Sequence, residues 1–402
     1  MNRPTINTRI IHPLSFKFIL IITLLEIFLG GGGRLMDVGT VSPRMYLFAI
    51  GIIVSTYLIF RLVPVGKPVI FILFCATIMM MLSSFIGVYN EANVLLVFND
   101  IKPLLSFYSL LFFYYTIKDI NDVFLVTRLL KISALILAIL YIIAFILING
   151  RLISFDNFYR SLSSTEEFFF RGEFAFFYKG FLYMCIGLLF YLAEDKRKSL
   201  VIVILATAII LTFTRGFFIS IVITYLFYHV AIRRSASKFL LFLILAIVAI
   251  LSLWNVFYTS KIDRKTSDSA RLTQIREVLN EITPASVFVG HGFGIGVPSR
   301  PDRMEITYLE TFHKQGIIGL LFWTGLFFLN WRLYVRAVRN GSARLAGPFI
   351  LSIVFVYAES LTNPYLTNPI GLTMVLLSLV CLTILGSAKS SVAVKEIQPG
   401  AA

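Results

Sequence analysis

Four glycines stand within the seven residues from Gly290 to Gly296. Glycine lets backbone N–H groups come close to a ligand, as in the nests that bind phosphate. The pattern is not a nucleotide-binding fingerprint, because no strand and helix flank it as that motif requires. On glycine content alone, a flexible turn between two helices is an equally good interpretation. His291 lies inside this turn and is a weak candidate for a catalytic base.

Glu305 stands at the predicted start of a helix that continues into an apolar run. A carboxylate at a helix N-terminus is electrostatically favoured, so capping alone would explain this acid. A base that accepts a proton from a hydroxyl group is the functional alternative. Helical spacing predicts that one face of this helix carries Glu305, Tyr308, Phe312, Gly316 and Gly319. The two glycines predict close packing against a neighbouring helix.

Arg215 is the only charged residue in the 34-residue stretch 199–232. One helix of that length would measure about 51 Å, too long for a single crossing of a bilayer core of about 30 Å. We therefore expect two helices divided at Thr214-Arg215-Gly216, with Arg215 at a membrane surface. A lone guanidinium there is costly without a partner or a role, which favours function over snorkelling to the headgroups.

The composition predicts an all-α polytopic membrane protein. Of the 402 residues, 58% are hydrophobic and 14% are charged, against about 25% charged in an average soluble domain. This excludes a soluble enzyme and a disordered chain. Cys75, Cys185 and Cys381 lie in apolar runs without a CxxC partner, so neither a disulfide framework nor a metal site is expected. Twelve apolar runs form one membrane domain, 1–402: 15–31, 45–63, 67–88, 101–117, 130–148, 175–193, 199–213, 216–232, 239–257, 316–331, 346–362 and 369–386.

The positive charges predict the orientation in the membrane. With both termini in the cytoplasm, short loops carry 20 Lys and Arg inside and 4 outside. The net charge of +15 then reflects basic inner loops rather than nucleic-acid binding. Two long loops, 149–175 and 258–315, face outward, the second between the ninth and tenth spans. The larger loop contains an amphipathic helix, on the membrane surface or packed on the spans, with a stripe of Leu272, Ile275, Leu279 and Ile282.

The ordered motifs resemble the bacterial O-antigen polymerase and O-antigen ligase family over roughly residues 170–335. Arg271 and its helix, followed by Gly290-His291-Gly292-Phe293-Gly294, resemble the large periplasmic loop of these proteins. The segment from Glu305 to Leu309, followed by Gly316-Ile317-Ile318-Gly319, resembles the end of that loop. Thr212 to Gly216 resembles the family's Ser/Thr-Arg-Gly at the end of a span.

The resemblance implies a GT-C-like membrane glycosyltransferase in the bacterial inner (cytoplasmic) membrane, with its active site on the periplasmic side. The implied donor is a glycan on undecaprenyl diphosphate, and the partners are this donor, a glycan acceptor and the lipid bilayer. No nucleic acid, cofactor or metal is implied. Whether a chain-length regulator binds is left open by the sequence.

One departure separates the two activities of this family. Ligases carry His followed by Asn, Ser or Gln eleven residues before the first glycine of the Gly-x-x-Gly, where this chain has Glu305 and Ile306. Polymerases of O-antigen, capsule or exopolysaccharide vary more at this position and often have an acid. The sequence therefore favours a polymerase, with an O-antigen ligase as the alternative. A transporter of lipid-linked oligosaccharides is the rival of another class, but no matching pair of broken spans supports it.

The resemblance also implies roles for individual residues. Catalytic roles fall to Glu305, Arg215 and Arg271, and the glycan-binding loop comprises Gly290, His291, Gly292, Gly294 and Tyr308. Arginines pair well with diphosphate oxygens, and the candidates are Arg171, Arg215, Arg271, Arg300 and Arg303. Arg276, like Arg300 and Arg303, is equally suited to binding anionic lipid. Glu359 is either part of the site or a structural partner of an arginine. The aromatic residues that flank Arg171 predict an interfacial belt.

The predicted orientation can be tested with cysteines introduced at Ser163 and Ser299, one in each long loop. We expect an impermeant thiol reagent to label both positions in intact cells, because both loops face outward. Labelling that appears only after lysis would contradict the predicted topology and would place the expected active site on the other side of the membrane.

Overall fold

The chain folds mainly into helices, as its composition predicts. The computed structural model describes residues 14–35, 41–61, 63–171, 175–193, 198–233 and 265–387. Within this part of the chain, six helical segments are long and apolar enough to cross a membrane. They are α2 (Pro43–Phe60), α3 (Lys67–Tyr89), α4 (Val94–Leu104) continued by η2 (Leu105–Tyr108) and α5 (Ser109–Thr116), α6 (Ile120–Asn149), α10 (Arg215–Phe227) continued by η3 (Tyr228–Ile232), and α14 (Thr307–Arg339). This is the architecture of a helical membrane protein.

Shorter helices complete the described bundle. They are α1 (Leu14–Leu29), α7 (Phe155–Ser163), α8 (Phe181–Leu192), α9 (Ser199–Leu211), α15 (Ala343–Glu359) and α16 (Pro369–Leu385). Helices overlap eleven of the twelve predicted runs, and the ninth run, 239–257, lies outside the described residues. The predicted division before α10 is confirmed, because a turn separates it from α9. Phe213 in that turn has a φ of 50°, a left-handed backbone conformation that cannot continue the helix.

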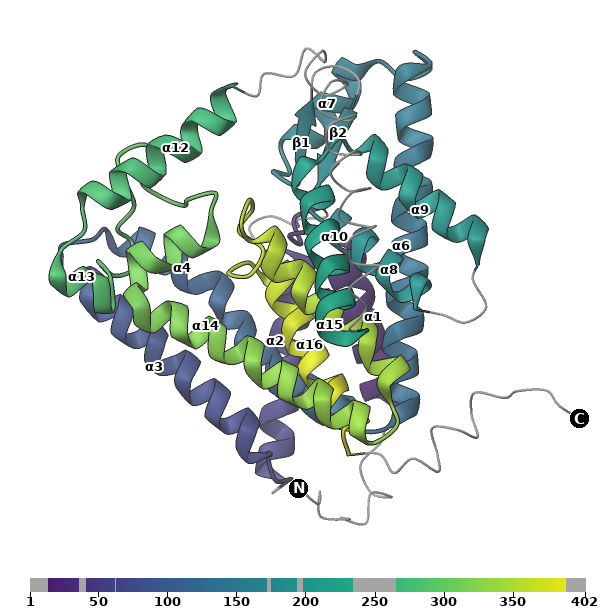
Figure 1. Ribbon diagram of the computed structural model, residues 1–402, viewed down its shortest axis with the longest axis horizontal. Coiled ribbons are helices and arrows are strands. Elements are labelled where there is room, and N and C mark those ends of the chain that lie inside the picture. The colour runs from purple at the N-terminus through teal and green to yellow at the C-terminus, as the bar shows by residue number, and fades with distance from the viewer. Residues whose placement is uncertain are drawn as a thin grey trace, which may run out of the picture.

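Helices α8 and α16 lie at the centre of the bundle. Every side chain from Phe181 to Tyr191 is buried, and so are nearly all side chains of α16. A helix that is apolar on every side needs neighbours all round, and α6 and α15 contact both of these helices. Figure 1 shows α15 and α16 between α3 on one side and α6 and α9 on the other. At the periphery, α3 exposes Phe71, Phe74 and Phe85, which suits contact with lipid.

A β-hairpin follows α7 and corrects three predictions. Strand β1 (Phe168–Arg171) pairs antiparallel with β2 (Ala175–Tyr178), so the chain is not all-α and the sixth apolar run begins as a strand. Aromatic side chains favour strands because they pack well across a pleated surface. The predicted interfacial belt is wrong for the second strand, whose aromatic side chains are buried inside the protein: Phe176, Phe177 and Tyr178.

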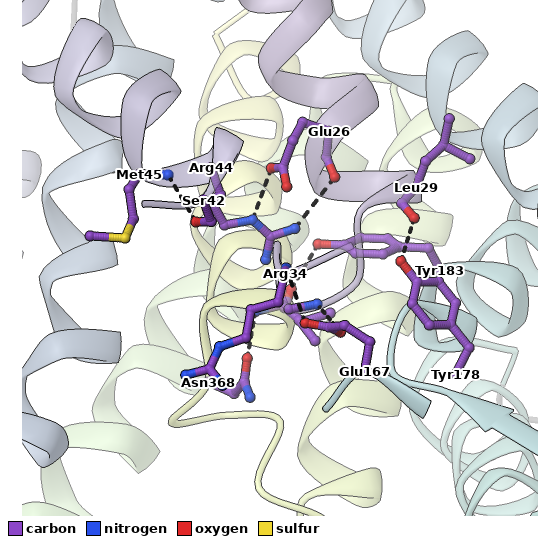
Figure 2. A network of polar contacts seen from close by, with 12 residues as sticks. Glu26, Leu29, Arg34, Ser42, Arg44, Met45, Glu167, Tyr178, Tyr183 and Asn368 are labelled. Carbon is purple, nitrogen blue, oxygen red and sulfur yellow. Dashed lines mark hydrogen bonds and ion pairs between the residues drawn. The ribbon is translucent and has the colours of Figure 1, made fainter. Parts of the chain in front are cut away.

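The buried acid Glu167 joins this hairpin to the turn after α1. Its carboxylate accepts the N–H groups of Gly32 at 2.6 Å and Arg34 at 3.2 Å. A Cβ atom on Gly32 would lie only 2.4 Å from Glu167 Oε1, so glycine is needed there. Figure 2 shows this contact beside the ion pair in which Arg44 of α2 donates to Glu26 of α1, at 2.8 Å. These bonds fix α1 and α2 against the hairpin.

The described part of the large loop contains α12 (Lys265–Asn280) and α13 (Pro284–Val289). Pro284 is the first residue of α13, where the missing N–H is not needed. Helix α12 turns Gln274 and Val278 inward. The predicted apolar stripe therefore faces away from the spans, and three of its residues are strongly exposed: Leu272 (57%), Leu279 (60%) and Ile282 (39%). Of the two predicted placements, packing on the spans is confirmed, but through Val278 rather than through the stripe: Val278 lies in one apolar cluster with Leu309 and Phe312 of α14. Placement of the exposed stripe on the membrane surface stays a prediction.

The glycine turn, residues 290–296, packs tightly against α3. Gly292 has a φ of 92°, which suits glycine. A Cβ atom on Gly292 would lie 2.0 Å from the amide nitrogen of Gly87. Three successive N–H groups of the turn bond to carbonyl oxygens of the protein: His291 to His313 (2.8 Å), Gly292 to Lys314 (3.0 Å) and Phe293 to Ser83 (2.8 Å). This backbone is a packing element rather than an open phosphate nest.

Substituting Gly292 tests this packing. We expect Gly292→Ala to destabilise the solubilised protein by about 1–3 kcal/mol or more, because the added carbon overlaps the backbone of α3. The matched control is Gly325→Ala in α14, where no heavy atom lies within 4 Å of the added carbon. The unfolding temperature of both variants is measured by heating the solubilised protein and determining the remaining folded fraction by size-exclusion chromatography. Equal unfolding temperatures for the two variants would contradict the close approach of the turn to α3.

Candidate active site

The turn between α15 and α16, residues 360–368, is the meeting point of the predicted site residues. We call it the joining turn. The N–H group of Thr307, the first residue of α14, bonds to the Ser360 carbonyl at 3.2 Å. Its hydroxyl donates to the Asn363 carbonyl at 3.3 Å. The joining turn therefore fixes the start of α14, next to Glu305.

Helix α10 meets this turn through Gly216, its second residue. A Cβ atom on Gly216 would lie 2.7 Å from both Glu359 Oε1 and Thr362 Oγ1, which leaves no room for a larger residue. Glu359 is completely buried, and its carboxylate accepts from Ser220 and Asn363, each at 2.7 Å. The acid thus has two hydrogen-bond donors that bind α10 to the joining turn. Arg215 precedes Gly216 and opens α10 at this junction.

Glu305 lies in an ion-pair cluster with two of the predicted arginines. Its Oε2 atom is 2.9 Å from Arg271 Nε, and its Oε1 atom is 3.0 Å from Arg300 Nη2. Arg271 also donates to the carbonyl of Thr362 in the joining turn, at 3.4 Å. The capping interpretation is wrong, because the N-cap of α14 is Ile306 and no side chain caps it. The structure therefore brings Arg271, Arg300 and Glu305 together.

A second charged cluster lies inside the bundle. The Lys314 ammonium of α14 contacts Asp100 of α4 at 2.8 Å and Glu310 at 2.9 Å. It also donates to the Asp302 carbonyl at 3.0 Å. The other carboxylate oxygen of Asp100 accepts the Gly294 N–H at 2.8 Å. All three side chains are buried. An unpaired charge would be strongly destabilising there, so each charge requires an opposite charge beside it.

Among the other predicted residues, Arg303, Arg276 and Tyr308 do not join Glu305, and the side chain of Arg171 lies outside the described part of the chain. Arg303 donates to the Asn99 carbonyl at 2.7 Å and so contacts α4. Arg276 is exposed on α12, and Arg171 ends β1. Tyr308 does not hold Glu305, because its hydroxyl donates to the Tyr357 carbonyl at 2.7 Å.

The predicted shared face of α14 is also wrong beyond Gln315, because Gly316 breaks the helix with φ 62° and ψ −160°. The predicted close packing at Gly316 is confirmed by a Cβ position 2.4 Å from the Phe288 backbone.

Lys179, which the sequence analysis did not select, adds a cation near the hairpin. Burial lowers the pKa of its ammonium group, the carboxylate of Glu167 opposes that shift, and the positive charges of Arg34 and Arg303 add to it. Its carbonyl accepts from Tyr365 in the joining turn at 3.2 Å. The hairpin therefore contributes positive charge to the same end of the bundle.

His291 stacks near His313, with ring centroids 4.7 Å apart. The Nε2 atom of His313 is 3.7 Å from Glu281 Oε2. Within the described ranges, no group of three or more His, Cys, Asp or Glu residues could hold a metal ion. His291 is thus paired with a second imidazole rather than with a ligand set.

Two signals in the sequence could have revealed the missed residues. Asp100 and Lys314 are charged positions next to or inside apolar segments, where a charge demands a partner. The joining turn repeats Leu-Thr-Asn-Pro, at 361–364 and again at 366–369. Its polar side chains and carbonyls make the contacts described above. Which residues pair could not be read from the chain, because Asp100 and Lys314 are 214 positions apart.

Comparison with known proteins supports the family relationship. No protein-family model matches this chain. The O-antigen polymerase of Shigella flexneri is 28% identical to it over 369 residues, which cover 89% of this chain and 92% of that protein. A similarity of this length includes nearly the whole membrane bundle rather than one shared motif. The chain is therefore related to the O-antigen polymerases, which confirms the resemblance found in its ordered motifs.

Proposed function

We propose that this protein is a membrane glycosyltransferase that polymerises oligosaccharide repeat units carried on undecaprenyl diphosphate. The observation that carries the proposal is the similarity to an O-antigen polymerase over 89% of the chain. Glu305 in place of the ligase histidine favours a polymerase over an O-antigen ligase. The proposed reaction takes place on the outer face of the inner membrane, and its product is O-antigen, capsule or exopolysaccharide.

In the proposed reaction, a hydroxyl oxygen of the acceptor glycan attacks the anomeric carbon of the donor. The new glycosidic bond forms while the bond to undecaprenyl diphosphate breaks, and the hydroxyl proton passes to a carboxylate. The departing diphosphate gains negative charge, which positioned hydrogen-bond donors stabilise. Arg271 contacts the joining turn directly, Arg300 reaches it through Glu305, and Arg215 opens the helix that packs on it. These three arginines are the proposed diphosphate ligands.

Glu305 needs a change of partner before it can act as a base. Its two oxygens are paired with Arg271 and Arg300, and the Arg300 side chain is 49% exposed. An ion pair as exposed as the one with Arg300 contributes about 0–1 kcal/mol, so a diphosphate can displace the carboxylate from Arg300 at little cost. The pair with Arg271, whose side chain is 26% exposed, is held more firmly. Donor binding would then release Glu305 to accept the acceptor proton. The base would become free only when the donor is in place.

The role of Arg215 is tested by Arg215→Lys, which keeps the charge and loses the paired donors. We expect polymer formation to fall by about 10- to 100-fold, the loss of one charged hydrogen bond, at normal protein level. The measurement is the surface glycan of a deletion strain that carries the variant, separated on a gel. Arg160→Lys on α7, an exposed arginine, is the matched control. Wild-type polymer from Arg215→Lys would refute paired recognition and favour snorkelling.

The role of Glu305 is tested by Glu305→Gln, which keeps the shape and cannot accept a proton. We expect the rate of polymerisation to fall by about 10²–10⁴, leaving single repeat units on the gel. Glu91→Gln, an exposed acid in the turn after α3, is the control and should polymerise normally.

A further variant separates a base from a residue that only positions arginines. Glu305→His restores a base but not the anionic partner of Arg271 and Arg300, so partial activity favours the base. If Glu305→Gln polymerises like the wild type, the acid has no role in proton transfer.

A further inference from the structure

A small pocket lies where α4, the glycine turn, the first turns of α14 and the joining turn meet. Asp100, Phe293, Arg303, Glu310, Gln315 and Thr367 line it. The pocket is half open, and its empty space amounts to about 330 Å³ only when the open solvent at its mouth is counted. The diphosphate chemistry proposed above uses neither Glu310 nor Gln315.

Part of this lining is already saturated by the protein. The three N–H groups of the Lys314 ammonium match its three contacts, to Asp100, Glu310 and the Asp302 carbonyl. Both oxygens of Asp100 are taken, one by Lys314 and one by the Gly294 N–H. Lys314 and Asp100 therefore hold the pocket wall together, and Lys314 has no N–H group left for a ligand.

Two acceptors remain unused in the same pocket. Glu310 uses its Oε1 atom for Lys314, and its Oε2 atom has no partner among the described residues. The side-chain oxygen of Gln315 is buried and also lacks a donor in the described part of the chain, and only 5% of that residue is exposed. A buried acceptor without a donor costs about 1–3 kcal/mol. The Gln315 oxygen is such an atom, and together with the unused carboxylate oxygen of Glu310 it indicates a ligand that donates hydrogen bonds.

The charges of the pocket select a neutral ligand. An anion would be repelled by the carboxylate of Glu310 at the point where the free acceptor lies. A metal ion would lie beside the Lys314 ammonium, 2.9 Å from that carboxylate. Hydroxyl groups donate to both free oxygens without added charge, and the Phe293 ring offers an apolar surface to the C–H groups of a sugar.

We propose that this pocket binds one sugar residue of the acceptor glycan, with Glu310 and Gln315 accepting from its hydroxyl groups. This assignment rests on the proposed polymerase function. The arginine cluster would hold the donor diphosphate, and Thr362 of the same joining turn contacts that cluster. Thr367, five residues further along the turn, lines the pocket. The turn thus places the two substrates beside each other, on either side of Glu305 and the start of α14.

The direct test measures binding of the free repeat-unit glycan, released from its lipid by mild acid, to the full-length protein in nanodiscs. Saturation-transfer NMR should show contact with the wild type. Glu310→Gln replaces an acceptor by a donor and should weaken binding about tenfold, the equivalent of 1.4 kcal/mol. Thr367→Phe fills the mouth of the pocket without touching the ion pairs and should abolish binding. Glu166→Gln, an exposed acid that pairs with Arg34, is the control and should bind normally.

The outcomes separate the pocket from the proposed function. Loss of glycan binding in Glu310→Gln and Thr367→Phe, with unchanged binding of inorganic diphosphate, supports the assignment. Wild-type glycan binding by both variants, or no contact with the wild type, overturns it. Loss of diphosphate binding in these variants would make the pocket an anion site and also overturns it. If the wild-type gene fails to restore polymer in a deletion strain, the polymerase proposal fails, whatever the NMR result.

Discussion

The buried ion pair between Lys314 and the acids Asp100 and Glu310 is the contact on which the candidate site depends. A charge inside an apolar bundle is tolerated only with a partner. Here the pairing joins α4 to α14, and the same Asp100 accepts the N–H group of Gly294. One side chain therefore fixes the glycine turn, the start of α14 and the wall of the pocket. The joining turn then aligns α10, α12 and α14 on this fixed frame.

Helices were predictable from the sequence because apolar runs of span length have few alternatives in a protein with this composition. The division before Arg215 is an example: no single helix of that length fits a bilayer. The hairpin after α7 was not predictable in the same way, because a run of phenylalanines suits a membrane interface, a helix or a strand equally well. The choice of strand depends on the pairing between Phe168–Arg171 and Ala175–Tyr178, and this pairing depends on tertiary packing.

The sequence was sufficient to select candidate site residues but not to predict which of them contact one another. Arg215, Arg271 and Glu305 were selected by motif order. The structure pairs Arg271 with Glu305 beside the joining turn and begins α10 at Arg215, while the roles of all three stay predictions. Their partners could not be derived, because Arg271 and Glu305 belong to different elements and meet only through folding. The same limit applies to Tyr308, which helical spacing placed on one face with Glu305. Its hydroxyl instead donates to the carbonyl of Tyr357, which lies in another helix. Helical spacing within α14 cannot predict such a contact.

Exposure separates the two sets of charges into permanent and exchangeable pairs. Lys314 is 3% exposed, and breaking its pairs would leave a buried charge, at a cost of about 3–5 kcal/mol. Arg300 is 49% exposed, and water can replace its carboxylate partner with little loss. A site that must bind and release a charged lipid needs exposed, exchangeable ion pairs. Buried, permanent ion pairs hold these in position. Glu305 and Glu310 show this division within six residues. Glu305 has one oxygen on the exchangeable Arg300 and the other on the less exposed Arg271, whereas Glu310 has one oxygen on a fixed lysine and one without a partner among the described residues.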